Sequence, residues 1–176
     1  MSGVRTDGIS RAASGTEADG YRSMAGSFTG GLALNDTWRT ELLARFSDSH
    51  AEIDGFPPPS FTLADSDETE DTQDYAAAGR LLHDHAGFNG ALTVSYNAID
   101  RVNKDGGVET FGGEGDRLSA DYLGAIKLSE RARIIAGAEA ERTSVMVSGV
   151  DEDASAGAVF AMVEVKPIDG LTLSAG

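Results

Sequence analysis

RLSADYLGAIKLSERARIIAGAEAERTSV, residues 117–145, alternates between two kinds of side chain. Every second residue from Leu118 to Leu128 is apolar or small, whereas the residues between them include Arg117, Asp121 and Lys127. After a turn-like Ser-Glu-Arg, the same alternation resumes. A period of two is typical of a β-strand with two different faces. The stretch therefore predicts a long β-hairpin whose apolar face is built largely from Ala and Gly.

Strand-like segments with the same alternation recur along the chain, at 24–34, 38–46, 92–98 and 159–165. Short turn-like connections are expected at 34–38, 84–90, 128–132 and 167–171, and long polar connections at 13–20, 52–73, 103–115 and 149–155. Short and long connections alternate, which predicts an all-β fold of about eight long antiparallel strands in an up-and-down meander. Segments 38–46 and 134–138 also fit helical spacing, so a helix stays open there.

The composition excludes several classes of protein. The chain has 176 residues with a net charge of -15, so a nucleic-acid partner is not expected, because phosphate binding needs clustered Lys and Arg. It contains no cysteine, which excludes disulfides and thiolate metal sites. No run approaches the roughly 18 apolar residues of a membrane helix. The N-terminus lacks a signal peptide, so the protein is either cytoplasmic or its beginning is missing.

The expected strands are long, about 10 to 14 residues, where soluble strands average about half that length. A tilted strand needs roughly 9 to 11 residues to cross a bilayer. Short turns on one rim, long loops on the other, and one apolar face are typical of an outer-membrane barrel. Fluid lipid chains fill irregular spaces, so a lipid-facing surface needs apolarity but not bulk, and Ala and Gly suffice.

We therefore expect part of a transmembrane β-barrel in the bacterial outer membrane, with lipid on its apolar face. Trp38 directly follows a short turn, and Tyr21 and Tyr75 lie near long loops, as expected of aromatic residues at the two membrane interfaces. Isolated aromatic residues on soluble strands are the alternative interpretation. Under that alternative, the chain is a soluble, secreted β-sandwich that serves as a binding module.

Two segments carry a resemblance to a known family: TDGISRAASGTEADGYRSMAGSFTGGLALNDTWR (6–39) and, after an acidic loop, GRLLHDHAGFNGALTVSYNAIDR (79–101). The arrangement resembles the mid-barrel region of TonB-dependent outer-membrane receptors, most of all the cobalamin-receptor branch. The resemblance covers most of the chain and rests on overall texture, such as DGYRS followed by DTWR, with no catalytic signature.

The resemblance implies a 22-stranded barrel around an N-terminal plug, with import energised by the periplasmic partner TonB. This sequence shows no plug, no partner-binding box and no terminal strand ending in an aromatic residue. We therefore expect residues 1–176 to be an internal part of the barrel domain. The implied function is uptake of a scarce small-molecule nutrient, such as a corrinoid or a metal chelate. A passive, porin-like channel is the alternative.

The acidic loop is the main candidate for a metal site. Asp54, Asp65 and Asp67 offer the oxygen ligands that Ca²⁺ prefers, and the cobalamin receptors that the chain resembles bind Ca²⁺ in loops of this region. An EF-hand is excluded, because the sixth position counted from Asp65 is Glu70 and the twelfth is Ala76. A solvated acidic loop without a metal remains the alternative. A structural Ca²⁺ ion is the only cofactor that the sequence suggests.

Residues 52–73 and 103–115 are the expected substrate-binding loops. Six charged residues are expected on the lumen side, in contact with the plug or with water: Arg39, Glu41, Arg45, Arg117, Asp121 and Glu139. His83 and His85 lie two apart on one strand face, where they could chelate a metal or simply flank a turn. We find no catalytic group, so the protein is not expected to be an enzyme.

Overall fold

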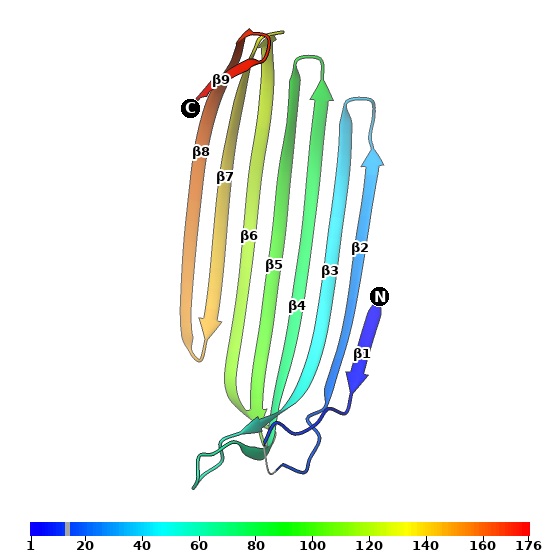
Figure 1. Cartoon of the computed structure of the whole chain (residues 1–176), viewed down its shortest axis with the longest axis vertical. Helices are drawn as coiled ribbons and strands as arrows, with labels where there is room; N and C mark the ends of the chain where they lie inside the picture. The colour runs from blue at the N-terminus through cyan, green and yellow to red at the C-terminus, as the bar shows by residue number, and fades with distance from the viewer. Residues whose placement is uncertain (13–14) are drawn as a thin grey trace.

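The computed structural model describes residues 1–12 and 15–176, and the strands form one antiparallel sheet in chain order (Figure 1). None of the described residues forms a helix long and apolar enough to cross a membrane. The two segments that also fitted helical spacing lie within strands. The strands are β1 (Ser2–Thr6), β2 (Tyr21–Ala33), β3 (Trp38–Gly55), β4 (Ala64–His85), β5 (Phe88–Asp105), β6 (Val108–Ser129), β7 (Ala132–Val147), β8 (Val150–Ile168) and β9 (Leu171–Ala175).

The predicted up-and-down meander is confirmed, because each strand pairs only with its neighbours in the sequence. The four predicted short turns are also confirmed, and they gather at one end of the sheet, which we call the turn rim: 34–37, 86–87, 130–131 and 169–170. At the other end, the loop rim, the chain connects through 7–20, 56–63, 106–107 and 148–149.

Two of the four predicted long loops are wrong. Residues 103–115 belong almost entirely to β5 and β6, which meet at the two-residue turn Gly106–Gly107. Both glycines have positive φ, 55° and 80°, as the tightest hairpin turns require. Similarly, residues 150–155 lie in β8, after a turn at Ser148–Gly149 with φ of 49° and 85°. These polar residues extend the strands, which reach 22 residues in β4 and β6.

The predicted loop 52–73 is shorter in the structure. Only residues 56–63 lie outside strands, because β3 continues to Gly55 and β4 begins at Ala64. Together with residues 7–12 and 15–20, this segment forms the irregular part of the loop rim, at the bottom of Figure 1. Residues 13–14 of the predicted connection 13–20 lie outside the described residues.

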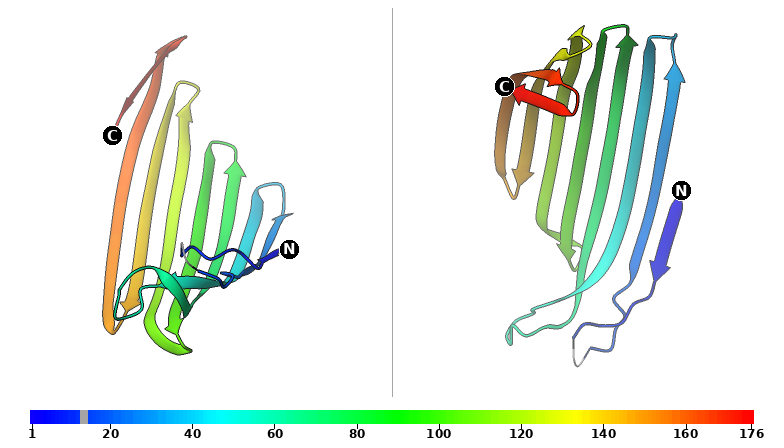
Figure 2. Two further views of the ribbon diagram at one scale, coloured as in Figure 1. Left: turned by 60° about the horizontal axis from the view of Figure 1, so that its bottom comes forward. Right: turned by 45° about the horizontal axis from the view of Figure 1, so that its top comes forward.

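The two faces of the sheet differ as predicted. Paired residues on neighbouring strands share a face, and one such row runs from Phe28 through Ala44, Ala77 and Tyr96 to Leu118. On the opposite face, residues of seven neighbouring strands, β1 to β7, line a single groove, so that face is concave. Figure 2 shows the curvature of the open sheet. The face that carries Phe28 and Leu118 is therefore convex.

The apolar residues of the convex face form a band that starts at the turn rim. It extends from Trp38 to Phe46 on β3 and from Phe88 to Ala98 on β5, close to the 9 to 11 residues of a tilted membrane-crossing strand. Towards the loop rim, the first polar residue on each strand marks the edge of the band: Arg22, Asp48, Gln73, Asp100, Asp116, Arg142 and Ser155.

The edge of the apolar band slants across the strands. The row that begins at Asp48 on β3 reaches Asp151 on β8, but the edge on β8 lies at Ser155, four residues nearer the turn rim. Four residues cover about 14 Å along a strand, and five strand spacings cover about 24 Å, so the slant is about 30°. Strands of membrane barrels tilt by about 35–45°, so a flat membrane crosses them at this kind of slant.

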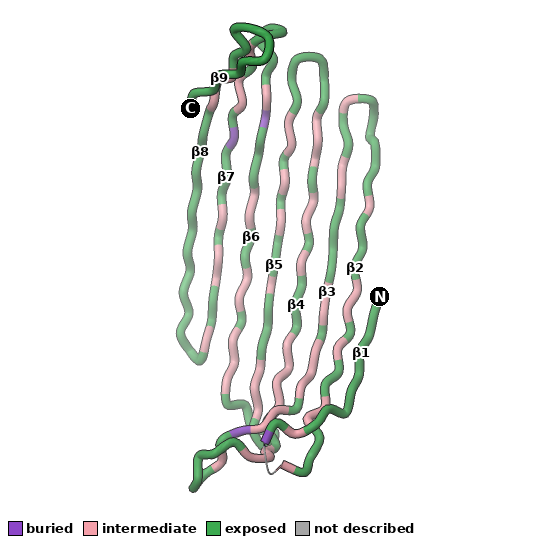
Figure 3. The backbone as a smooth tube through the Cα atoms, in the orientation of Figure 1, coloured by how far each residue is buried: buried purple, intermediate pink, exposed green. Residues whose placement is uncertain are grey.

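The sheet has no packed core within the described part of the chain. Only Ala12, Gly55, Gly124 and Gly137 are buried, as Figure 3 shows by the few purple segments. Large apolar side chains such as Phe28 and Leu32 remain about 60% exposed. The described residues form one sheet, with no second sheet over the apolar face, which differs from the two packed layers of a β-sandwich.

Glycines in the band make room for aromatic rings that lie along the sheet. A Cβ on Gly124 would come within 2.7 Å of the Tyr122 hydroxyl, and one on Gly90 within 2.8 Å of the same atom. Phe46 covers Gly26 in the same manner, at 2.5 Å from its Cβ position. On the concave face, Gly137 lies beneath Phe160. The small residues therefore make room for the aromatic rings.

We expect Gly137→Ala to destabilise the folded sheet by about 1–3 kcal/mol. The new Cβ would lie 2.5 Å from the Phe160 ring and 2.9 Å from the Tyr122 carbonyl oxygen, and the backbone atom cannot rotate away. Gly79→Ala is the control, because its Cβ would meet only Leu42, at an ordinary 3.6 Å. Urea unfolding of the full-length protein in detergent, compared between the two variants, is the measurement. Equal stability of the two variants would contradict the prediction.

Candidate functional site

The concave face carries a groove of about 810 Å³ whose floor follows one row of paired residues. The row runs from Ser27 through Arg45, Ala76 and Asn97 to Arg117. The guanidinium groups of Arg45 and Arg117 therefore lie three strand spacings apart, with Ala76 and Asn97 between them. The groove lies at the level of the loop-rim edge of the apolar band. A polar solute that enters from the loop rim would meet these groups.

All six charged residues that were expected to face the lumen lie on the concave face. Glu41 accepts contacts from Arg39 at 3.1 Å and Arg80 at 3.6 Å, and Arg117 approaches Glu141 at 3.5 Å. The concave face also holds the pairs Arg101–Glu70 and Arg133–Glu164. Such mixed charges are typical of a water-filled lumen. Asp121 and Glu139 are direct partners across β6 and β7, an arrangement that is unfavourable without a neighbouring cation.

A second cluster lies at the loop rim, where the connection 7–20 crosses the ends of β3 and β4. Ser10 Oγ donates to Asp54 Oδ2 at 3.1 Å or to Asp65 Oδ1 at 3.0 Å, since a hydroxyl has one proton. The backbone N–H of Ala12 donates to Asp54 Oδ2 at 2.7 Å, and that of Thr16 to Asp65 Oδ2 at 2.7 Å. The two carboxylates therefore hold the N-terminal connection against the sheet.

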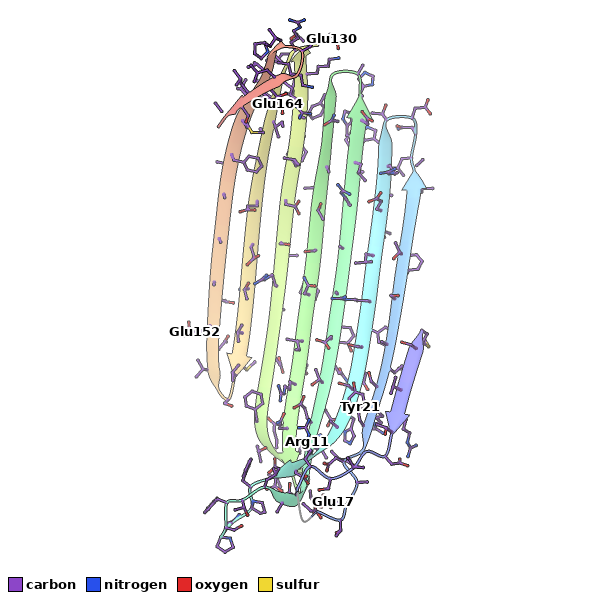
Figure 4. The ribbon with its side chains drawn as sticks, viewed as in Figure 1. Arg11, Glu17, Tyr21, Glu130, Glu152 and Glu164 are labelled. Atoms are coloured by element: carbon purple, nitrogen blue, oxygen red, sulfur yellow. The ribbon has the colours of Figure 1, made fainter. Side chains whose placement is uncertain are left out.

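Carboxylate oxygens converge in this cluster. Glu17, Asp19 and Asp54 each offer one oxygen, and these atoms lie within 4.8 Å of one another. Asp54 Oδ1 is buried and has no hydrogen-bond partner among the described residues. A buried carboxylate oxygen without a donor is costly unless a cation compensates it. The donor set therefore fits Ca²⁺, which takes several carboxylate oxygens. Figure 4 shows Glu17 at the loop rim.

The structure changes the ligand set that the sequence suggested. Asp54 belongs to the converging group, whereas Asp65 uses its oxygens to hold the connection 7–20, and Asp67 affects the cluster through its charge. Glu17 and Asp19 were missed, because they lie more than thirty residues away from Asp54 in the sequence. No local spacing pattern could have indicated them.

The ionisation of the cluster follows from these contacts. The pKa of Glu17 is raised, first by desolvation and then by the negative charges of Asp65, Asp67 and Asp54. The pKa of Asp65 is lowered, chiefly by the hydrogen bond from the Thr16 N–H. A cation beside Glu17 would relieve the repulsion between the carboxylates.

The two histidines at the turn rim join an aromatic cluster. The ring of His83 lies 4.5 Å from Trp38 and 5.0 Å from Phe88, and 6.5 Å from His85, measured between centroids. His83 Nδ1 is buried without a hydrogen-bond partner in the described structure. His83 therefore packs between aromatic rings on the convex face. Among the described residues, neither His83 nor His85 belongs to a group of three or more side chains that could hold a metal ion.

Comparison with solved structures identifies the fold. BauA, the ferric preacinetobactin receptor from Acinetobacter baumannii, matches with a TM-score of 0.61 over 89% of this chain, at 9% sequence identity. The copper transporter OprC covers 90% of the chain at 12% identity, but its TM-score of 0.49 is too low to support an argument. The chain spans 30% of the length of BauA and 29% of that of OprC. No protein-family model matches, and no curated protein does.

The sheet is thus similar in fold to a part of BauA that makes up 30% of the length of that receptor. The fold prediction is confirmed to this extent: an all-β, antiparallel meander that forms an open sheet.

We expect Asp65→Asn to release the connection 7–20 from the sheet, because a neutral amide is a weaker acceptor for the Thr16 and Glu17 N–H groups. Exchange of these two amide protons should become roughly tenfold faster, as measured by hydrogen–deuterium exchange. In the unmodified protein, protection should be complete above the ordinary aspartate pKa. It should be lost as the pH falls through the lowered pKa of Asp65.

Asp67→Asn is the matched control, because the Asp67 carboxylate forms no side-chain hydrogen bond among the described residues. Equal exchange rates in the two variants would show that Asp65 does not hold the segment.

Proposed function

We propose that the chain forms part of the barrel of an outer-membrane receptor that takes up a scarce nutrient with energy from TonB. The single observation that carries this proposal is the two-faced curved sheet. It combines a slanted apolar band on the convex face with a charged groove on the concave face. The similarity to BauA supports the same interpretation. In the complete protein, a plug domain would fill the lumen and meet the charged residues of the concave face.

The nutrient that we propose is a corrinoid or a metal chelate. The corrinoid rests on the sequence resemblance to cobalamin receptors, and the chelate agrees with the name of BauA, a ferric preacinetobactin receptor. We propose that the ligand is first captured at the loop rim. The candidate residues within 52–73 and 103–115 lie side by side there, because β3, β4, β5 and β6 pair through their loop-rim ends.

Ca²⁺ binding at the loop rim is a second part of the proposal. The buried, unpartnered Asp54 Oδ1 favours it, since Asp54 is one of the three converging carboxylates. When bound, the ion would tie the connection 7–20 to the end of β3. The role of the ion would be structural, because it would order the surface that the ligand meets first.

Uptake by the full-length protein tests the transport function. We expect cells that express it to accumulate radiolabelled cyanocobalamin or a ferric siderophore only when TonB is present. Deletion of residues 56–63 should lower ligand binding at least about tenfold, if these residues capture the ligand. Uptake that is equal with and without TonB, and that rises linearly with external concentration, would instead identify a passive channel. Unchanged binding after the deletion would contradict the capture role.

Calorimetric titration of the full-length protein with Ca²⁺ tests the metal site. Asp54→Asn and Glu17→Gln should each weaken binding by about tenfold or more, because each removes one carboxylate charge. Asp151→Asn, an exposed loop-rim carboxylate on β8, is the control and should have no effect. Affinity should fall as the pH drops through the raised pKa of Glu17, since the ion competes with a proton there. Binding that survives both substitutions would rule out this site.

A further inference from the structure

The convex face carries a groove with aromatic walls at the loop-rim end of the apolar band. Its volume is about 500 Å³. The floor consists of Gly26, Ala44 and Ala77, and the walls of Met1 together with four aromatic residues, Phe28, Phe46, Tyr75 and Tyr96. Phe46 and Tyr75 are direct partners in one row, whereas Phe28 and Tyr96 lie at the two ends of the neighbouring row, with Ala44 and Ala77 between them. The groove is therefore long, narrow and apolar, and it opens where the proposed function places lipid.

A row of basic residues lies beyond this groove, further towards the loop rim. Arg5 of β1 pairs with Arg22 of β2, which pairs with His50 of β3, so the three side chains share the convex face. They line a second pocket of about 360 Å³. Arg22 lies four residues beyond Gly26 on the same strand, about 14 Å along it. That distance suits a lipid whose headgroup lies at the basic row, towards the loop rim, and whose acyl chain lies in the groove, towards the turn rim.

Two carboxylates near the basic row are engaged by groups outside it, and a third, Asp71, contacts His50 of the row itself. Glu52 accepts the Gly20 N–H at 2.9 Å, and Asp48 accepts from Gln73 at 3.1 Å. Asp71 contacts His50 at 2.6 Å and Lys104 at 3.2 Å, and these two hydrogen bonds lower its pKa. Asp7 also borders the pocket.

Arg5 and Arg22 form none of the ion pairs found among the described residues. Elsewhere on the convex face, Arg142 shows the contrasting case, because Asp153 neutralises it at 3.0 Å. Arg5 and Arg22 therefore present guanidinium donors towards the membrane surface, where phosphate groups are the complementary acceptors.

We propose that β1–β4 form a binding site for a phosphorylated lipid of the outer leaflet. Arg5, Arg22 and His50 hold the phosphate, and the aromatic groove holds one acyl chain. The inference rests on the proposed membrane position of the sheet, but not on the identity of the transported nutrient. The site would fix the N-terminal strands against the bilayer near the segment 7–20, on the side of the sheet opposite the transport pathway.

Binding of lipid A to the delipidated full-length protein in detergent tests the site, with dephosphorylated lipid A as the second probe. Arg22→Gln should weaken binding of the phosphorylated lipid about fivefold, and the double variant with Arg5→Gln more than about tenfold. Neither variant should change binding of the dephosphorylated lipid. Ala44→Phe, which fills the groove, should weaken both lipids. Tyr96→Ala removes one wall without adding bulk and should also weaken both.

Matched controls lie on β7 of the same face. Arg142→Gln removes a paired arginine, and Ala138→Phe adds the same ring within the apolar band, so both should bind lipid within about twofold of the parent protein. Heat-modified electrophoretic mobility verifies that each variant is folded. Unchanged affinity in the double arginine variant overturns the proposal, as does unchanged affinity in the folded groove variants. Complete displacement of the lipid by an equal concentration of inorganic phosphate also overturns it, because that site would bind a free anion.

TonB-dependent uptake, measured on the same variants, separates this proposal from the transport function. Lipid-site variants that lose lipid affinity while the parent protein transports its nutrient support both proposals. A parent protein that binds lipid at this site without transporting refutes only the transport function.

Discussion

The whole structure depends on one constraint: a single layer of backbone hydrogen bonds must separate two different environments. Each inner strand satisfies its N–H and C=O groups through its two neighbours, so the sheet needs no core for that purpose. Its side chains, however, find almost no protein to pack against, and only four described residues are buried. In the function proposed above, lipid would supply these contacts on the convex face, and water or a plug domain would supply them on the concave face.

The small residues follow from this constraint. A core between two protein layers needs bulky interlocking side chains, because rigid surfaces leave voids. Lipid chains are fluid, so alanine and glycine leave no permanent void. Glycine also lets the rings of Phe46 and Tyr122 lie along the sheet, where a Cβ would collide with them. The same positions therefore serve both the lipid contact and the packing of aromatic residues within the sheet.

The two rims of the sheet differ, because only at the loop rim do the strands continue as polar segments beyond the apolar band. Tight turns close the turn rim, next to the apolar band, whereas β3 to β6 continue past the band towards the loop rim. This extension carries both the acidic cluster around Asp54 and the basic row around Arg22. The two charged sites lie on different parts of the same rim, so one can bind a cation while the other contacts the membrane surface.

The sequence by itself determined the strand pattern, the four short turns and the face on which residues such as Arg45 and Glu139 lie, because period-two alternation is a local property of the backbone. It misjudged residues 103–115, since polar strand ends that extend beyond a membrane have the composition of a loop. The slant of the apolar band, the meeting of Glu17 with Asp54 and the alignment of Arg5, Arg22 and His50 were decided only by the tertiary structure. These features depend on the register between strands, which hydrogen bonds between distant segments fix and which no local pattern encodes.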